Sequence, residues 1–173
     1  MADSVLMQVI APRDRFGRVL FRLCRGVALT GGLTLLAVAA MTVASVASRA
    51  LAGHALLGDF ELVQLGCAVA VASFLPYGQM RRTHVLVDFF TSGMSPRSKR
   101  RLDAVGALLL ATCAAAIAWQ MTIGMLEIRA AGETSMLLGV PVWAVYLMMV
   151  PSFALLSLTG LHSAWTFLGG GES

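Results

Sequence analysis

Four long apolar stretches occupy most of this 173-residue chain and contain no Asp, Glu, Lys or Arg. They are residues 27–48, 62–80, 104–126 and 141–168, and the last is interrupted only by His162. A helix rises about 1.5 Å per residue, so about 20 apolar residues cross a hydrocarbon core of about 30 Å. Because a backbone in lipid must satisfy its own hydrogen bonds, each stretch is predicted to be a helix. The sequence therefore predicts an all-α integral membrane protein with four transmembrane helices.

The four spans leave no room for a soluble domain, so residues 1–173 are predicted to form a single membrane domain. With the residues that continue each helix included, the spans are predicted at about 27–48, 61–80, 102–129 and 141–167. A basic start, an apolar run and Ala50-Leu51-Ala52 imitate a secretory signal peptide. The apolar run is, however, longer than the roughly 7–15 residues of such a segment. We therefore interpret the first stretch as an uncleaved span.

The basic residues lie in two blocks, and this asymmetry predicts the orientation of the chain. Five arginines precede the first span: Arg13, Arg15, Arg18, Arg22 and Arg25. Six basic residues lie between the second and third spans: Arg81, Arg82, Arg97, Lys99, Arg100 and Arg101. The other two connections hold only Arg49 and Arg129. Short loops rich in Lys and Arg stay cytoplasmic, which predicts that both termini are inside. The basic ends are expected to contact anionic lipid headgroups, and the pattern indicates no nucleic-acid binding.

An amphipathic helix is predicted at about residues 12–26, directly before the first span. Its apolar side chains recur at helical spacing, at Phe16, Val19, Leu20 and Leu23. Its basic side chains occupy the opposing stripe, at Arg15, Arg18, Arg22 and Arg25. This pattern is typical of a helix that lies in the inner membrane interface. A simple cytoplasmic extension of the first span is the alternative.

Small residues recur at three- and four-residue spacing in two spans, where they let helices approach closely in lipid. In the first span they are Ala37, Ala40, Ala44, Ala47 and Ser48. In the third span they are Ala107, Ala111 and Ala115, with Ala114 and Ala118 beside them. These faces are predicted to pack against protein, partly within the chain and partly against a larger partner.

Residues at the outer ends of the spans are candidates for structural roles. Asp59 is predicted to cap the helix of the second span, and Glu61 to lie in its first turn, where the positive end of the helix dipole favours a carboxylate. Proline disfavours helix in the residue before it, so the fourth span is predicted to begin at Pro141. The nine residues before it, from Gly132, are then predicted to form an outer loop with an apolar half.

The sequence shows few residues of the kinds that catalysis or transport would require. No Asp, Glu, Lys or Arg lies in the middle of a span, where transport sites usually place such groups. No nucleophile or metal motif is present, so neither an enzyme nor a cofactor is predicted. Cys24, Cys67 and Cys113 lack metal-type spacing and are interpreted as small apolar residues. His84 and His162 fall near the inner ends of two spans, so the alternative is a haem- or quinone-associated membrane anchor subunit of a redox complex.

Several short motifs resemble a known family when taken in their order and spacing. They are Glu61-Leu-Val, Phe74-Leu75, Arg81-Arg82-Thr-His84-Val-Leu-Val-Asp88, Gly132-Glu133-Thr134-Ser135, Leu138-Gly-Val-Pro141-Val-Trp143 and Tyr146. Together they resemble the small membrane subunit, DctQ-like, of tripartite ATP-independent periplasmic (TRAP) transporters. The likeness covers the second to fourth spans, and the first span matches only in character.

The resemblance implies a non-catalytic subunit of a sodium-coupled transporter for organic acids in the bacterial inner membrane. It implies two protein partners, a large membrane subunit that translocates the substrate and a periplasmic substrate-binding protein. The small subunit would extend the static scaffold of the large one and help dock the binding protein.

The motif residues are carried over as structural or interface candidates, because the family places no catalytic residue on this subunit. Four are expected to anchor the inner end: Arg81, Arg82, His84 and Asp88. Among these, Asp88 is expected to face one of the two arginines. Five are expected to shape the outer side: Glu61, Glu133, Thr134, Ser135 and Pro141. Local capping and turn formation without any partner contact is the alternative for both groups.

Overall fold

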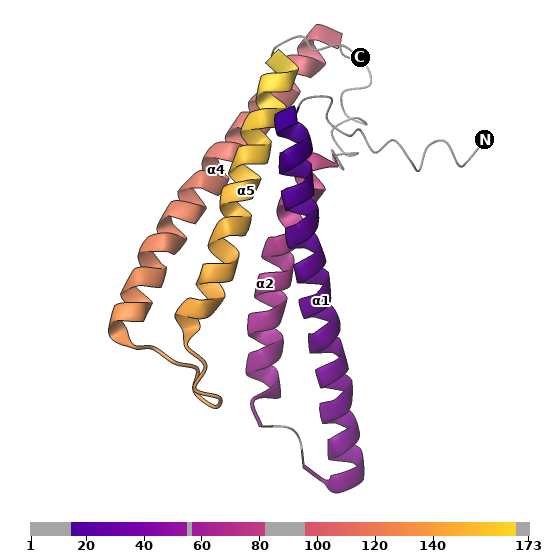
Figure 1. Ribbon diagram of the computed structural model, residues 1–173, viewed down its shortest axis with the longest axis vertical. Helices are drawn as coiled ribbons and strands as arrows, with labels where there is room; N and C mark the ends of the chain where they lie inside the picture. The colour runs from indigo at the N-terminus through magenta and orange to yellow at the C-terminus, as the bar shows by residue number, and fades with distance from the viewer. Residues whose placement is uncertain (1–14, 55–56, 82–95, 169–173) are drawn as a thin grey trace, which may run out of the picture.

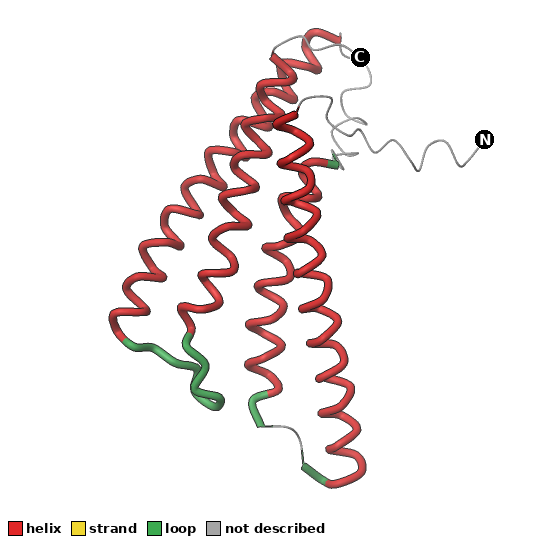
Figure 2. Tube along the Cα trace, viewed as in Figure 1, coloured by secondary structure: helices red, strands yellow, loops and turns green. Residues whose placement is uncertain are grey.

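The computed structural model describes residues 15–54, 57–81 and 96–168, and these residues are almost entirely helical (Figures 1 and 2). The helices are α1 (Arg15–Ala52), α2 (Asp59–Met80), α4 (Pro96–Ala131) and α5 (Val142–Leu168). Each is long and apolar enough to cross a membrane. The predicted all-α class with four candidate spans is therefore confirmed.

Helix α1 is continuous over 38 residues, which is about 57 Å at 1.5 Å per residue. Residues 15–26 belong to this helix, and no break separates them from the first span. Leu20 is buried in the bundle, whereas Phe16, Val19 and Leu23 are more than half exposed. An interfacial position for these turns stays a prediction.

The ends of α2 and α5 follow from their local chemistry. Gly58, and not Asp59, takes the N-cap position of α2, with a φ of 77° that favours glycine. Asp59 is the first helical residue, and Glu61 lies in the first turn as predicted. Helix α5 begins one residue after Pro141, whose carbonyl accepts a hydrogen bond from the Ala144 amide (3.1 Å).

The helices form two antiparallel hairpins, α1 with α2 and α4 with α5, which meet along a contact between α2 and α5 (Figure 1). Helix α1 touches α5 slightly, and within the described residues α4 packs on α5 alone. The hairpins diverge towards the end that carries the connections 53–58 and 132–141 (Figure 1), which we call the loop end. We call the opposite end, with the start of α1 and the finish of α5, the termini end.

Close packing between the helices rests on glycine and alanine. A Cβ at Gly31 would lie 2.6 Å from the Ser73 Cβ, which shows how closely α1 approaches α2. A Cβ at Gly160 would lie 2.9 Å from the Ala111 Cβ and 3.1 Å from the Ala107 carbonyl oxygen, so α4 and α5 are equally close. Small residues therefore allow the backbones to approach, as expected for helices in lipid.

The predicted small-residue faces are divided between the inside and the outside of the bundle. Ala107, Ala111 and Ala114 are buried against α5, while Ala115 is exposed. On α1 the stripe from Ala37 to Ala47 is exposed, because Gly31 and Ser45 lie on the face towards α2. Only the α4 stripe thus packs within the chain.

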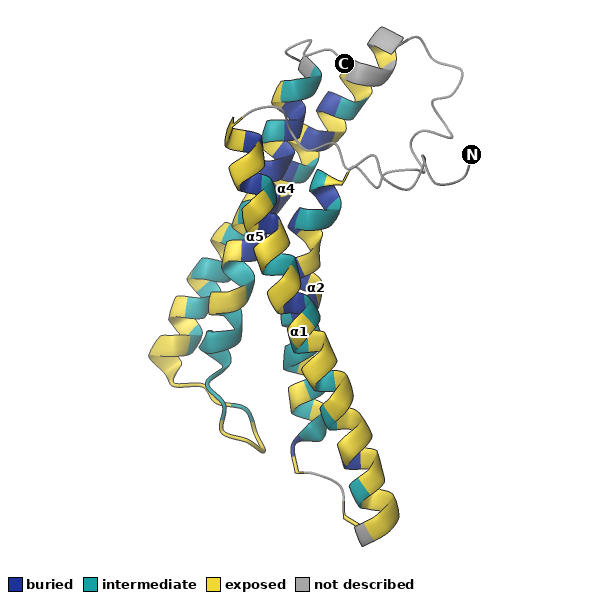
Figure 3. Ribbon diagram, turned by 45° about the vertical axis from the view of Figure 1, so that its right-hand side comes forward, coloured by how far each residue is buried: buried dark blue, intermediate teal, exposed yellow. Residues whose placement is uncertain are grey.

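Buried residues gather towards the termini end (Figure 3), where the hairpins are closest. Most are small, and the fully buried side chains include the hydroxyl groups of Ser152 and Thr159. Each hydroxyl donates to a carbonyl of its own helix, Ser152 to Met148 (3.4 Å) and Thr159 to Leu156 (2.8 Å). Of the three cysteines, Cys24 is buried as expected, Cys67 is half-buried and Cys113 is exposed.

Candidate functional site

The loop end holds most of the candidate residues that the structure describes, and its centre is a tight turn between α4 and α5. Thr134 pairs with Pro141 as an antiparallel bridge. The Ser135 amide donates to the Val140 carbonyl (2.9 Å), and the Gly139 amide donates to the Ser135 carbonyl (3.2 Å). The Ser135 hydroxyl oxygen also accepts from the Val140 amide (3.2 Å). We call residues 133–142 the α4–α5 turn.

Glu133 closes the base of this turn through its backbone. Its amide donates to the Ile128 carbonyl (3.2 Å), and its carbonyl accepts from the Val142 amide (3.3 Å). The preceding Gly132 has a φ of 68°, a conformation that ends helices without a Cβ penalty. Glu133, Thr134, Ser135 and Pro141 therefore act together in one turn, while the Glu133 side chain is exposed.

Glu61 links the start of α2 to the α4–α5 turn. One carboxylate oxygen accepts from the Leu137 amide (3.0 Å), and the other accepts from the Leu138 amide (3.2 Å). Hydrogen bonds from backbone amides to an ionised carboxylate are stronger than those between neutral groups. Glu61 thus satisfies two amides of a bent segment that offers them few other acceptors.

The same contact is closed on its apolar side by Gly58 and Leu138. A Cβ at Gly58 would lie 2.5 Å from the Leu138 Cγ, so the leucine side chain rests directly on the glycine. Met136, by contrast, is 99% exposed at the tip of the turn. The turn is therefore held by Glu61 and Leu138 and presents an apolar tip.

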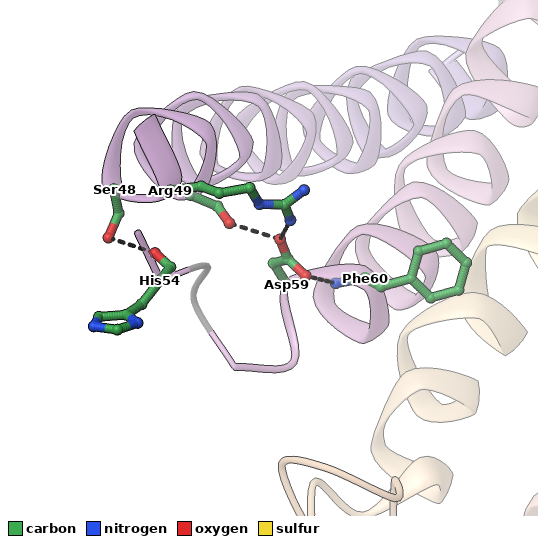
Figure 4. Close-up of polar contacts among 6 residues, drawn as sticks. Ser48, Arg49, His54, Asp59 and Phe60 are labelled. Carbon is green, nitrogen blue, oxygen red and sulfur yellow. Dashed lines mark hydrogen bonds and ion pairs between the residues drawn. The ribbon is translucent and has the colours of Figure 1, made fainter. Parts of the chain in front are cut away.

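Asp59 forms a second cluster at the loop end, between α1 and α2 (Figure 4). Its carboxylate accepts from the Ser45 hydroxyl (2.6 Å) and from the Phe60 amide (2.7 Å). Arg49 lies 3.9 Å away, and both side chains are partly exposed, so this ion pair contributes little by itself. Nearby, the Ser48 hydroxyl donates to the His54 carbonyl (3.0 Å), which shapes the connection (Figure 4).

The termini end is held by aromatic and cationic contacts. Arg81 forms the C-cap of α2, and its guanidinium lies 5.4 Å from the centre of the Tyr77 ring. The Tyr77 ring also lies 5.8 Å from that of Phe21 in α1. The predicted residues Arg82, His84 and Asp88 lie outside the described residues, as does the predicted pairing of Asp88.

His162, one of the two histidines of the haem alternative, packs its ring 5.9 Å from that of Phe16. Within the described ranges no group of three or more His, Cys, Asp or Glu side chains is arranged to hold a metal ion. The carboxylates of Asp59 and Glu61 instead accept hydrogen bonds that join helices and turns. These hydrogen bonds give the loop end a defined surface.

Sequence reasoning missed the partners of both carboxylates. Ser45 and Arg49 lie four residues apart near the end of α1, and a short connection brings that end to the start of α2. This spacing could have indicated that they face Asp59. The link from Glu61 to Leu137 crosses 76 residues and has no local signal.

Comparison with known proteins gives one match. The family model described as "Tripartite ATP-independent periplasmic transporters, DctQ component" matches residues 38–169, which is more than half of the chain. The chain belongs to the DctQ family. The comparisons with curated proteins and with solved structures gave no match.

Membership of the DctQ family confirms the resemblance that the motifs carried. The chain is a small membrane component of a TRAP transporter, and its four apolar helices make it a multi-pass membrane protein. The matched range includes α2, α4, α5 and all ten candidate residues of the two ends. It also includes the later part of α1, where the sequence alone showed likeness only in character.

Proposed function

We propose that this DctQ-family chain is the non-catalytic small membrane subunit of a sodium-coupled secondary transporter for organic acids. In this role it extends the static scaffold of the large substrate-translocating subunit and helps dock a periplasmic substrate-binding protein. The observation that carries the proposal is the family match over residues 38–169.

The placement of ionisable groups supports a scaffold role. Among the described residues, acidic side chains lie near helix ends, such as Asp59 and Glu61 in the first turn of α2. Proton and ion pathways generally need such groups deep in the bilayer. Substrate and sodium are therefore assigned to the large subunit.

The proposed orientation places the termini end in the cytoplasm and the loop end in the periplasm, across the bacterial inner membrane. The basic residues support it, because they concentrate before α1 and between α2 and α4. The arginines of the first turns of α1 are exposed, which suits contact with anionic headgroups of the inner leaflet.

The same orientation presents the α4–α5 turn to a periplasmic partner. Glu61 holds the turn through two amides, so its tip at Met136 is presented in a defined position. A fixed surface binds at a lower entropic cost than a flexible one, which favours docking.

The deciding experiment is sodium-dependent uptake of an organic acid by proteoliposomes that contain the large subunit, the binding protein and this chain. Uptake is expected to require this chain. Alanine at Glu61 or Glu133 should leave the dependence of rate on sodium concentration at its wild-type shape once the amount of complex is matched.

Two outcomes would contradict the proposal. Full uptake without this chain would remove it from the transport function. A change in sodium cooperativity for either alanine variant would mean that the chain contributes to the ion site. A visible absorption spectrum of the purified complex provides an independent check on the haem alternative.

A further inference from the structure

Gln120 places a carboxamide inside the uncharged part of α4, residues 104–126. At about 1.5 Å per residue, it lies about 10 Å along the helix from Glu127 and about 25 Å from Asp103, the nearest charged residues on either side. A hydrocarbon core is about 30 Å thick, so Gln120 lies inside it, nearer the loop end. Its side chain is exposed on the outside of this chain.

Threonine side chains on the exposed helix faces satisfy themselves locally. Thr34 and Thr42 of α1 and Thr112 of α4 each donate to the carbonyl four residues earlier, at 2.9 Å. Within residues 15–54, 57–81 and 96–168 the Gln120 carboxamide makes no such hydrogen bond. An amide transferred without a partner from water to hydrocarbon costs about 4–8 kcal/mol. A lipid-facing position is therefore unfavourable for this residue.

The face around Gln120 is also suited to a close neighbour. Cys113, Ala116 and Gly124 recur around Gln120 at three- and four-residue spacing, and Cys113 and Ala116 are exposed. A Cβ at Gly124 would meet no atom of the chain within 4 Å. The contact of α4 with α5 uses a different face, through Ala107 and Ala111. Since α4 packs on no other described helix, this second face is open for another protein.

We propose that the face of α4 formed by Cys113, Ala116, Gln120 and Gly124 packs against a transmembrane helix of the large subunit. That helix presents a hydrogen-bonding group at the depth of Gln120, and this polar complementarity is what selects protein over lipid there. The inference rests on the proposed function, since the partner is the large subunit of the same transporter.

The test is co-purification of this chain with a tagged large subunit in mild detergent. Gln120→Leu is expected to lower the amount of chain retained about three- to tenfold, the range for one hydrogen bond between transmembrane helices. The melting temperature of the isolated variant should stay unchanged or rise, because leucine needs no polar partner in an apolar environment.

Gln64→Leu is the matched control. Gln64 is also exposed, but it lies only about 4.5 Å along α2 from Glu61, so its amide reaches the membrane interface. Retention of this variant should match the wild type. Equal losses for the two variants would overturn the inference, because depth in the bilayer would then be irrelevant.

A photo-cross-linking residue at Ala116 identifies the neighbour directly. Cross-links to the large subunit are expected there, and none from the same residue at Leu108, an exposed position on another side of α4. Cross-links at Ala116 to a second copy of the chain, or to lipid alone, would overturn the inference. If the wild-type chain fails to co-purify at all, the proposed function itself fails.

Discussion

Glu61 forms a long-range contact with the amides of Leu137 and Leu138, across 76 and 77 residues. A tight turn leaves some backbone amides without a carbonyl acceptor in the turn itself. A hydrogen-bond acceptor from another segment therefore stabilises the bend. The carboxylate serves both amides at once because it has two oxygens. At the residue scale, one acidic side chain therefore ties the second hairpin to the first.

Glu61→Ala should accordingly loosen the α4–α5 turn. Hydrogen exchange at Leu137 and Leu138 is expected to become several-fold faster, since both amides lose their acceptor. Exchange measured by mass spectrometry on the peptide that covers this turn would report the change. Glu133→Ala is the control, because Glu133 contributes its backbone to the turn. Unchanged exchange in Glu61→Ala would contradict the assigned hydrogen bonds.

Residue-scale reasoning from the sequence predicted the position of Glu61 correctly but not its contact. The helix dipole explains a carboxylate in the first turn of α2 by itself, so no local signal pointed to a distant turn. The N-cap was predicted one residue late, at Asp59, because aspartate commonly caps helices. Gly58 holds that position instead, in a left-handed conformation and beneath the Leu138 side chain.

At the scale of elements, α4 has two small-residue faces, of which one packs on α5 and the other is exposed. Ala107 and Ala111 accept the close approach of Gly160, while Ala115 and Ala116 face away from the chain. The spacing of the alanines in the sequence identified candidate packing faces, but this spacing does not show which neighbour each face meets. Which face meets α5 depends on the rotation of the helix, and only the structure supplies it.

Ala111→Leu should therefore destabilise the chain itself. Added methylene groups in a closely packed contact cost about 1–3 kcal/mol, and the Gly160 backbone leaves no room for them. Thermal unfolding of the isolated chain in detergent is expected to shift downwards for Ala111→Leu. Ala115→Leu, one turn along α4 but exposed, should unfold like the wild type. The opposite order would mean that α4 is rotated relative to its position in this structure.

The four spans were the most predictable elements, because their length and lack of charge are set by the bilayer. The ends were less predictable where polar residues continue the helix, as in α1, which is continuous from Arg15. Hydropathy marks where a helix enters lipid, whereas the helix itself continues through polar residues into the headgroup region.

At the scale of the whole molecule, the two ends of the bundle are predicted to face opposite compartments. Single cysteines that replace His54 and Met136, in a chain without native cysteines, should react with an impermeant thiol reagent in intact cells. Both positions are exposed at the loop end. A cysteine at Ser98, in the first turn of α4, should react only after the membrane is disrupted. Early reaction at Ser98 would reverse the proposed orientation.

The arrangement as two hairpins also bears on how the chain is made. Each helix has its main contact with a neighbour in sequence, α1 with α2 and α4 with α5. Elements that are adjacent in sequence can pair as soon as the second is synthesised. The first hairpin can therefore assemble in the membrane while the ribosome is still translating the second. The Glu61 contact forms last, because the amide that donates to its carboxylate belongs to a residue synthesised 76 positions later.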